Sequence, residues 1–153
     1  MDRTKRRKKR PKKKIKYVKS KKEKEFKEKY EGKYYFNSMK IKSKSELLIC
    51  YFLSANRINV AYEREIYIDG KEYRPDFIIE DDKGNIVILE HFGIDDEQYN
   101  KKKIEKIRNY KKLCDENKNF YFIQTDEDDI KNLKDNLGKK LNDETPIKKS
   151  YWR

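Results

Sequence analysis

The first regular pattern of hydrophobic and polar residues begins at Ser43. Ser43 and Glu46 have the spacing of a capping box, in which each residue satisfies a free backbone group at a helix start. Apolar side chains then recur at helical intervals at Leu47, Leu48, Tyr51, Phe52 and Ala55. This pattern predicts a helix over residues 43–56 that packs one face on a core.

Three segments with strand-like composition follow this helix. Residues 60–68, 73–80 and 86–91 are rich in β-branched and aromatic residues. Turn-forming residues separate them, with Asp69-Gly70 in the first connection and residues 82–85 in the second. The spacing predicts an antiparallel meander of three strands.

The C-terminal half continues with alternating helical and strand-like patterns. A helix is expected over residues 97–117, followed by a continuous apolar strand at 120–123. Thr125 is expected to cap a last helix, and the acidic residues 126–129 suit the positive end of its dipole. The order of helix, three strands, helix, strand and helix predicts an α/β fold with a central mixed sheet flanked by helices.

Positive charge is concentrated at the N-terminus. The net charge of the 153-residue chain is +13, but residues 1–44 alone carry +16 and residues 45–153 carry −3. Residues 1–29 have too few apolar side chains to order themselves, so we expect residues 1–42 to form a basic arm that is disordered or partly helical. The aromatic residues Tyr34, Tyr35 and Phe36 would stack on bases or pack the arm onto the rest of the protein. At the other end, residues 139–153 are expected to form a polar tail.

The basic arm indicates a polyanionic partner, and we expect it to tether nucleic acid through phosphate contacts. A solubilising or nuclear-localisation role is the alternative. The residues expected to bind nucleic acid are Arg6, Arg7, Lys8, Lys9, Arg10, Lys12, Lys13 and Lys14.

Cysteine usage and hydropathy indicate the compartment in which the protein is expected. Cys50 and Cys114 are far apart and belong to no zinc-binding pattern or disulfide framework. The chain has no apolar run of about 20 residues and begins without a secretory signal, so we expect a soluble protein with no membrane partner. An intracellular location is expected: cytoplasm or nucleoid, or nucleus or virus factory if the protein comes from a eukaryotic virus.

Two carboxylates in the predicted meander provide the candidate chemistry. Asp76 follows Pro75 in a half-buried strand, where a charge needs a partner, and Glu90 ends the apolar run of the next strand. Carboxylates on neighbouring strands can converge on one divalent ion, and oxygen ligands of this kind suit Mg²⁺ or Mn²⁺. Strand alternation turns the ring of His91 away from Glu90, so His91 would contribute chiefly its backbone carbonyl.

These residues resemble a known family. Glu46 on the first helix, Pro75-Asp76 on the second strand and Glu90 at the end of the third resemble the PD-(D/E)XK nuclease superfamily. The resemblance covers residues 43–137 and implies a nuclease domain over 43–138 with a restriction-endonuclease-like αβββαβ core. Residues 88–94 with the later Tyr99, Lys106 and Tyr110 are similar to nuclease modules attached to some superfamily 1 DNA helicases.

The sequence departs from the family pattern at one position. The motif places a lysine two residues after the acidic residue of the third strand, where this chain has Phe92. Tyr99, Lys103, Lys106 and Tyr110 form one stripe on the second helix, with Ile104, Ile107 and Cys114 expected on its core side. We expect Lys106 to replace the missing lysine, with Lys103 as the fallback; solvent-facing lysines are the alternative.

The expected function is metal-dependent hydrolysis of DNA phosphodiester bonds, selective for a junction, flap, nick or mismatch. The expected catalytic residues are Asp76, Glu90, Lys106 and Glu46, although a helix cap alone would also explain Glu46. The secondary candidates are His91, Lys103, Tyr99 and Tyr110. A nucleic-acid-binding protein that has lost catalysis and a nuclease acting on RNA are the alternatives. Two further possibilities are a homodimer and a helicase or repair protein as partner.

Overall fold

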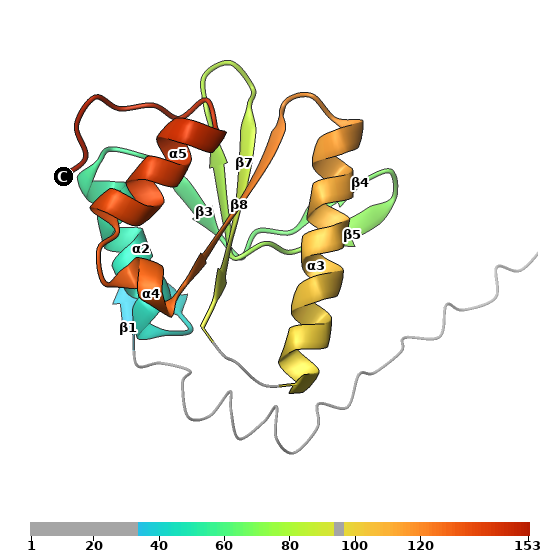
Figure 1. Ribbon diagram of the computed structural model, residues 1–153, viewed down its shortest axis with the longest axis horizontal. Coiled ribbons are helices and arrows are strands. Elements are labelled where there is room, and N and C mark those ends of the chain that lie inside the picture. The colour runs from blue at the N-terminus through green and yellow to red at the C-terminus, as the bar shows by residue number, and fades with distance from the viewer. Residues whose placement is uncertain (1–33, 94–96) are drawn as a thin grey trace, which may run out of the picture.

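A four-stranded mixed sheet forms the centre of the protein (Figure 1). The computed structural model describes residues 34–93 and 97–153, so the predicted nucleic-acid contacts of the basic arm lie outside the described residues. The sheet has the order β3 (Val60–Tyr62), β6 (Phe77–Glu80), β7 (Ile86–Phe92) and β8 (Phe120–Asp126). The first three strands are antiparallel neighbours, and β8 runs parallel to β7. The predicted α/β class with a mixed sheet is confirmed.

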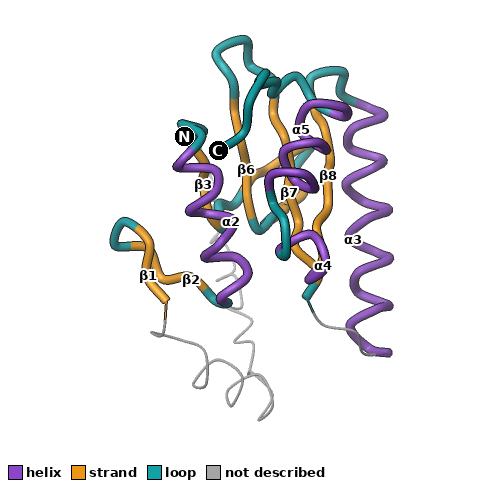
Figure 2. Tube along the Cα trace, turned by 60° about the vertical axis from the view of Figure 1, so that its left-hand side comes forward, coloured by secondary structure: helices purple, strands orange, loops and turns teal. Residues whose placement is uncertain are grey.

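Helices cover both faces of this sheet (Figure 2). Along β7, Val87 and Leu89 face a core shared with α2 (Lys44–Ala55) and the C-terminal helical elements. The C-terminal elements are α4 (Glu127–Ile130), the π-helical segment η1 (Lys134–Gly138) and α5 (Lys139–Glu144). Ile88 faces the opposite side, against α3 (Glu97–Glu116). No helix in the described parts of the chain is long and apolar enough to cross a membrane.

The meander is interrupted where the sequence predicts continuous strands. Residues 66–73 form a separate two-stranded ribbon of β4 (Ile66–Ile68) and β5 (Lys71–Tyr73), joined by the predicted turn. Glu63 adopts a positive φ of 49°, and Pro75 has no backbone N–H to donate to a ladder. The chain therefore leaves the sheet on both sides of the ribbon, and Asp76 lies just before β6 instead of inside a strand.

The buried face of α2 differs from the predicted one. The helix begins after Ser43 and buries Phe52 as predicted, but Ala55 is exposed, and Leu48 and Tyr51 are 38% and 53% exposed. The buried positions follow the helical spacing from Glu46 through Ile49, Cys50 and Leu53. A polar residue thus lies on the core side of the helix, which the apolar pattern could not indicate.

The buried face of α3 also needs correction. The helix matches the predicted range to within one residue, but Ile104 is 57% exposed. Tyr110 and Leu113 make the core contacts against the sheet. The stripe that begins with Tyr99 and Lys103 is therefore itself the sheet-facing side, and the predicted core side is wrong for Ile104.

The last helical region begins one residue later than predicted. Asp126 is the N-cap of α4, and Asp129 completes a reciprocal capping box with it. Thr125 is buried in β8, paired in register with His91. The prediction of Thr125 as a cap is wrong because the parallel pairing of β8 with β7 extends the strand through Asp126.

Both polar ends of the described chain pack on the body. Residues 34–41, predicted as part of a disordered or helical arm, form the hairpin of β1 (Tyr34–Phe36) and β2 (Met39–Ile41). Ile41 is buried, and the Phe36 ring meets Tyr51 edge-on at 5.2 Å. At the C-terminus, Leu141 and Trp152 are core residues, so residues 139–153 belong to the body and not to a tail as predicted.

Trp152 closes the core beside α2. Its ring stacks on Phe52 at a centroid distance of 5.6 Å. Gly138 allows this approach, because a Cβ at that position would lie 2.8 Å from Cγ of Trp152. The C-terminal residues are therefore fixed by aromatic packing against a backbone surface.

Replacement of Trp152 by alanine is expected to destabilise the fold. Loss of the buried ring should lower the free energy of unfolding by about 3 kcal/mol. Urea denaturation followed by circular dichroism measures this change. Tyr151→Ala is the matched control, because Tyr151 is 69% exposed and its loss should change stability by less than about 0.5 kcal/mol. Equal effects of the two substitutions would contradict the packing role of Trp152.

Candidate functional site

Asp76 and Glu90 lie opposite each other at one end of the β6–β7 hairpin. Phe77 pairs with Leu89, so the next residues outward are the two acids. Glu90 is only 1% exposed, and burial followed by the charge of Asp76 raises its pKa to about 8. The backbone N–H of His91 donates to Oδ2 of Asp76 at 2.9 Å, which fixes the position of that carboxylate. The sequence prediction that these two groups meet is consistent with this geometry.

Helix α3 contributes two groups that contact Glu90. The Tyr110 hydroxyl donates to Oε1 of Glu90 at 2.9 Å, and Nζ of Lys106 lies 3.5 Å from Oε2. Tyr110 is buried, whereas half of the Lys106 side chain is exposed. The two carboxylate oxygens thus have different partners, one a buried hydroxyl and the other a cation that also reaches the surface.

The fallback lysine has a different neighbour. Nζ of Lys103 lies 4.9 Å from the centroid of the Phe92 ring, and the Tyr99 ring lies 6.4 Å from the same ring. Phe92 is on the α3 side of the sheet, as strand alternation predicts for a residue two positions after Glu90. Of the two candidate lysines, only Lys106 is brought to the buried carboxylate.

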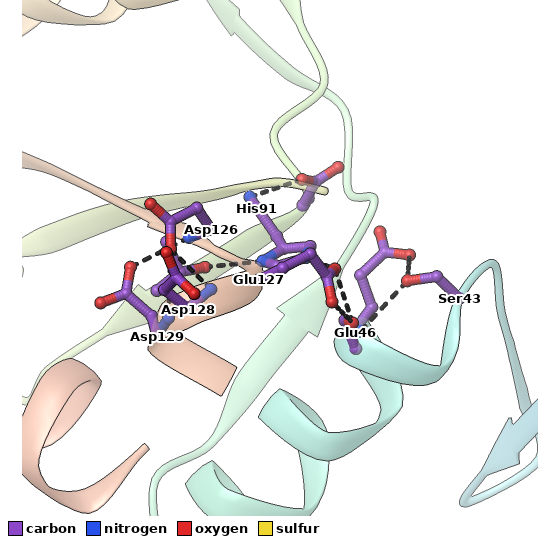
Figure 3. A network of polar contacts seen from close by, with 10 residues as sticks. Ser43, Glu46, His91, Asp126, Glu127, Asp128 and Asp129 are labelled. Carbon is purple, nitrogen blue, oxygen red and sulfur yellow. Dashed lines mark hydrogen bonds and ion pairs between the residues drawn. The ribbon is translucent and has the colours of Figure 1, made fainter. Parts of the chain in front are cut away.

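Glu46 approaches the site from the start of α2. Its side chain is 7% exposed, and burial followed by the charge of Asp76 raises its pKa. Tyr62 donates its hydroxyl to Oε1 at 3.3 Å. Ser43 donates to Oε2 at 2.5 Å (Figure 3). Ser43 also accepts the Glu46 backbone N–H, so the helix cap and the orientation of the carboxylate depend on the same side chain.

A groove opens beside these carboxylates. It has a volume of about 380 Å³ and lies between the β4–β5 ribbon and α3. Its lining residues are Lys42, Glu63, Lys71, Glu72, Tyr73, Arg74, Asp76, Lys106, Asn109 and Tyr110. Asp76 and the exposed part of Lys106 are therefore accessible to a bound molecule, and Glu90 lies behind them.

The acidic pair fits a hard divalent ion with mostly solvent ligands. Within residues 34–93 and 97–153, no group of three or more His, Cys, Asp or Glu side chains is arranged to hold a metal. Mg²⁺ is commonly held by only one or two carboxylates and keeps several waters. Burial, and then the charge of Asp76, raises the pKa of Glu90 despite the opposing charge of Lys106, and a bound cation would lower it.

The ring of His91 points to the opposite face of β7, where it joins a second polar network (Figure 3). Its Nδ1 lies 3.0 Å from Oγ1 of Thr125, and its Nε2 lies 2.9 Å from Oε1 of Glu127. Ser45 donates its hydroxyl to the same Glu127 oxygen at 2.7 Å. The network joins β7 and β8 to the starts of α2 and α4.

This network was not predicted from the sequence. Glu127 is one of four consecutive acidic residues, and nothing in that run distinguishes it from its neighbours. Its pairing with His91 depends on the parallel register of β7 and β8, which places Thr125 beside His91. His91 therefore contacts two polar groups at once, with its ring in this network and its backbone N–H on Asp76.

The raised pKa of Glu90 predicts a stability difference that depends on pH. Between 4.5, the ordinary carboxyl value, and about 8, the folded protein retains a proton that the unfolded chain has lost. The contribution of this group to stability therefore falls as the pH rises through that interval. Glu90→Gln removes the titration, so its unfolding free energy relative to the original protein should rise by roughly 4 kcal/mol across that interval.

Urea denaturation at several pH values, with a chelator present, measures this difference. Glu80→Gln at an exposed position of β6 is the control, and its difference from the original protein should stay constant with pH. A constant difference for Glu90→Gln as well would show that Glu90 ionises normally in the folded protein.

Comparison with protein-family models, curated proteins and solved structures gave no match.

Proposed function

We propose that this protein is a metal-dependent endonuclease that hydrolyses DNA phosphodiester bonds. The observation that carries the proposal is the carboxylate pair of Asp76 and Glu90, in which Glu90 is buried and contacts the ammonium group of Lys106. Metal-assisted phosphodiester hydrolysis needs clustered oxygen ligands next to a positive group that can stabilise developing negative charge. The site lies on an accessible groove, as such a reaction requires.

The order of elements supports a restriction-endonuclease-like core for this proposal. Helix α2, strands β3, β6 and β7, helix α3 and strand β8 follow the αβββαβ order. Glu46 on the first helix and Glu90 near the end of the third strand support the PD-(D/E)XK resemblance, whereas Asp76 lies just before the second strand instead of within it. The β4–β5 ribbon is an insertion between the first two strands of that order.

Asp76 and Glu90 would hold Mg²⁺ or Mn²⁺, with the backbone carbonyl of His91 as a further oxygen ligand. A bound ion of this kind polarises the phosphate and lowers the pKa of a coordinated water. Tyr110 orients Glu90 by donating to one oxygen, and the His91 N–H orients Asp76 in the same way. Both carboxylates are thus fixed before a substrate binds.

Lys106 and Glu46 would act on the reacting groups. Half of the Lys106 side chain is exposed in the groove, so its ammonium can move from Glu90 to a phosphate oxygen and offset charge there. Glu46 is oriented by Ser43 and Tyr62, and burial, which raises its pKa, makes its carboxylate a stronger base for accepting a proton from water. Lys106 takes the role that the lysine at the Phe92 position has in the family pattern.

The basic arm would add affinity without choice of sequence. Its lysines and arginines, including Arg6 and Lys14, would contact phosphates, and each phosphate neutralised steepens the salt dependence of binding by about 0.9 log units. The charge of the arm supports DNA as the partner, and it is equally compatible with RNA. Selectivity for a branched or interrupted structure fits a body this small, and a homodimer or a helicase or repair partner would extend the footprint.

One experiment separates this proposal from its alternatives. The full chain is incubated with labelled single-stranded, duplex and branched DNA and with RNA, in Mg²⁺, in Mn²⁺ and in a chelator. We expect cleavage of DNA in either metal and none in the chelator. Tight, salt-sensitive binding without cleavage would favour a non-catalytic binding protein, consistent with Phe92 at the motif position. Cleavage of RNA alone would identify a ribonuclease.

A further inference from the structure

We propose that the groove between the β4–β5 ribbon and α3 holds one nucleic-acid strand, so that the substrate is single-stranded at the point of cleavage. This inference rests on the proposed function and specifies its substrate class. Residues 71–74 form one wall of the groove, and Lys106, Asn109 and Tyr110 form the other, with Asp76 between them. The ribbon packs against the same hydrophobic cluster as Tyr110 and Leu113, which sets the separation of the two walls.

The size of the groove favours one strand over a duplex. Its volume of about 380 Å³ is near the lower end of the range of roughly 300 to 1,000 Å³ for small-ligand pockets. A B-form duplex, whose major groove alone is about 12 Å wide, would rest on the rims of such a groove. Glu90 is only 1% exposed, so a scissile phosphate must enter between the walls to approach the acidic pair.

The ribbon wall carries groups that suit a single strand. Nζ of Lys71 lies 5.2 Å from the centroid of the Tyr73 ring and has no carboxylate partner among the described residues. By contrast, Arg74 is already paired with Glu65 in the ribbon. Proteins that bind single strands combine cations that follow the backbone with aromatic rings that stack on bases. Lys71 can therefore bind a phosphate while Tyr73 contacts the adjacent base.

Photo-crosslinking tests this path without depending on cleavage. An oligothymidylate with one 5-iododeoxyuridine is bound to the full chain in Ca²⁺, irradiated, and the crosslinked residue is identified by mass spectrometry. We expect crosslinks at Tyr73 that disappear in Tyr73→Leu. Crosslinks confined to residues outside the groove, such as the basic arm, would overturn the inference.

Kinetics provide a second measurement with a matched lysine control. Lys71→Ala should lower kcat/KM for a single-stranded or flap oligonucleotide about tenfold, the loss expected for one charge-assisted contact. Lys83→Ala should have no effect, because Lys83 lies in the turn at the other end of the β6–β7 hairpin. Equal rates for Lys71→Ala and Lys83→Ala, or uninterrupted duplex cleaved as fast as a single strand, would overturn the inference.

The inference and the proposed function can fail separately. Crosslinking at Tyr73 without cleavage in Mg²⁺ or Mn²⁺ would support the single-strand groove and contradict the nuclease. Cleavage that requires Asp76 but is accompanied by no crosslink in the groove would support the nuclease and contradict the single-strand path.

Discussion

Asp76→Asn is expected to reduce cleavage at least about a thousandfold, which corresponds to roughly 4 kcal/mol of transition-state stabilisation. Asparagine keeps an oxygen that can accept the His91 N–H, so the backbone next to the site should be preserved. The substitution removes one of the two negative charges that would attract a divalent ion. The loss should therefore appear in the chemical step and in metal affinity while the fold remains intact.

Single-turnover cleavage over a range of Mn²⁺ concentrations measures this effect. Asp82→Asn is the matched control, because Asp82 is exposed in the turn at the far end of the hairpin, and it should retain full activity. Thermal unfolding without metal should show no loss of stability for Asp76→Asn, since the change also removes charge repulsion on Glu90. Full activity in Asp76→Asn would contradict the metal site.

The meeting of Asp76 and Glu90 could be predicted because it depends on local pattern. Two strands joined by a short turn pair in one register, and alternation then decides which side chains share a face. The same rule correctly predicted that Phe92 would share a face with Glu90 and that the His91 ring would turn away. Helical spacing brought Lys106 and Tyr110 to one side of α3, where both contact Glu90.

The remaining parts of the site depend on contacts between distant segments. The His91 network requires the register of the parallel strands β7 and β8, and Ser45 joins it from a helix 82 residues before Glu127. The ribbon wall of the groove depends on an interruption of two strands whose composition is continuously strand-like. Glu63 with its positive φ marks that interruption in the structure, but glutamate gives no such signal in a sequence.

The burial of a polar residue misled the sequence prediction for α2. Apolar periodicity placed the core side of α2 on Leu48 and Tyr51, whereas Glu46 lies on the buried face. Burial of a carboxylate opposes hydrophobic patterning and requires compensation by hydrogen bonds, here from Ser43 and Tyr62. The position where local rules fail is therefore also one of the candidate functional positions, and failures of this kind are often found at functional sites.

Lys106→Ala is expected to reduce cleavage by about a hundredfold to a thousandfold, the usual cost of removing a group that stabilises charge in the transition state. The ammonium is the only cation within ion-pair distance of Glu90 in the described parts of the chain. Because the Lys106 charge lowers the pKa of Glu90, its removal should raise that pKa further. The pH at which cleavage becomes maximal should therefore move upward in the variant.

Lys103→Ala is the control that decides between the two lysines of α3. Its ammonium lies over the Phe92 ring and not on a carboxylate, so the substitution should leave cleavage within about threefold of the original rate, as for a cation–π contact of about half a kcal/mol. Lys106→Arg should recover part of the lost activity, since it restores a positive charge at the same helix position. The measurement is single-turnover cleavage as a function of pH for all three variants. A larger loss in Lys103→Ala than in Lys106→Ala would transfer the role to the lysine next to Phe92, and the carboxylate site would keep its assignment.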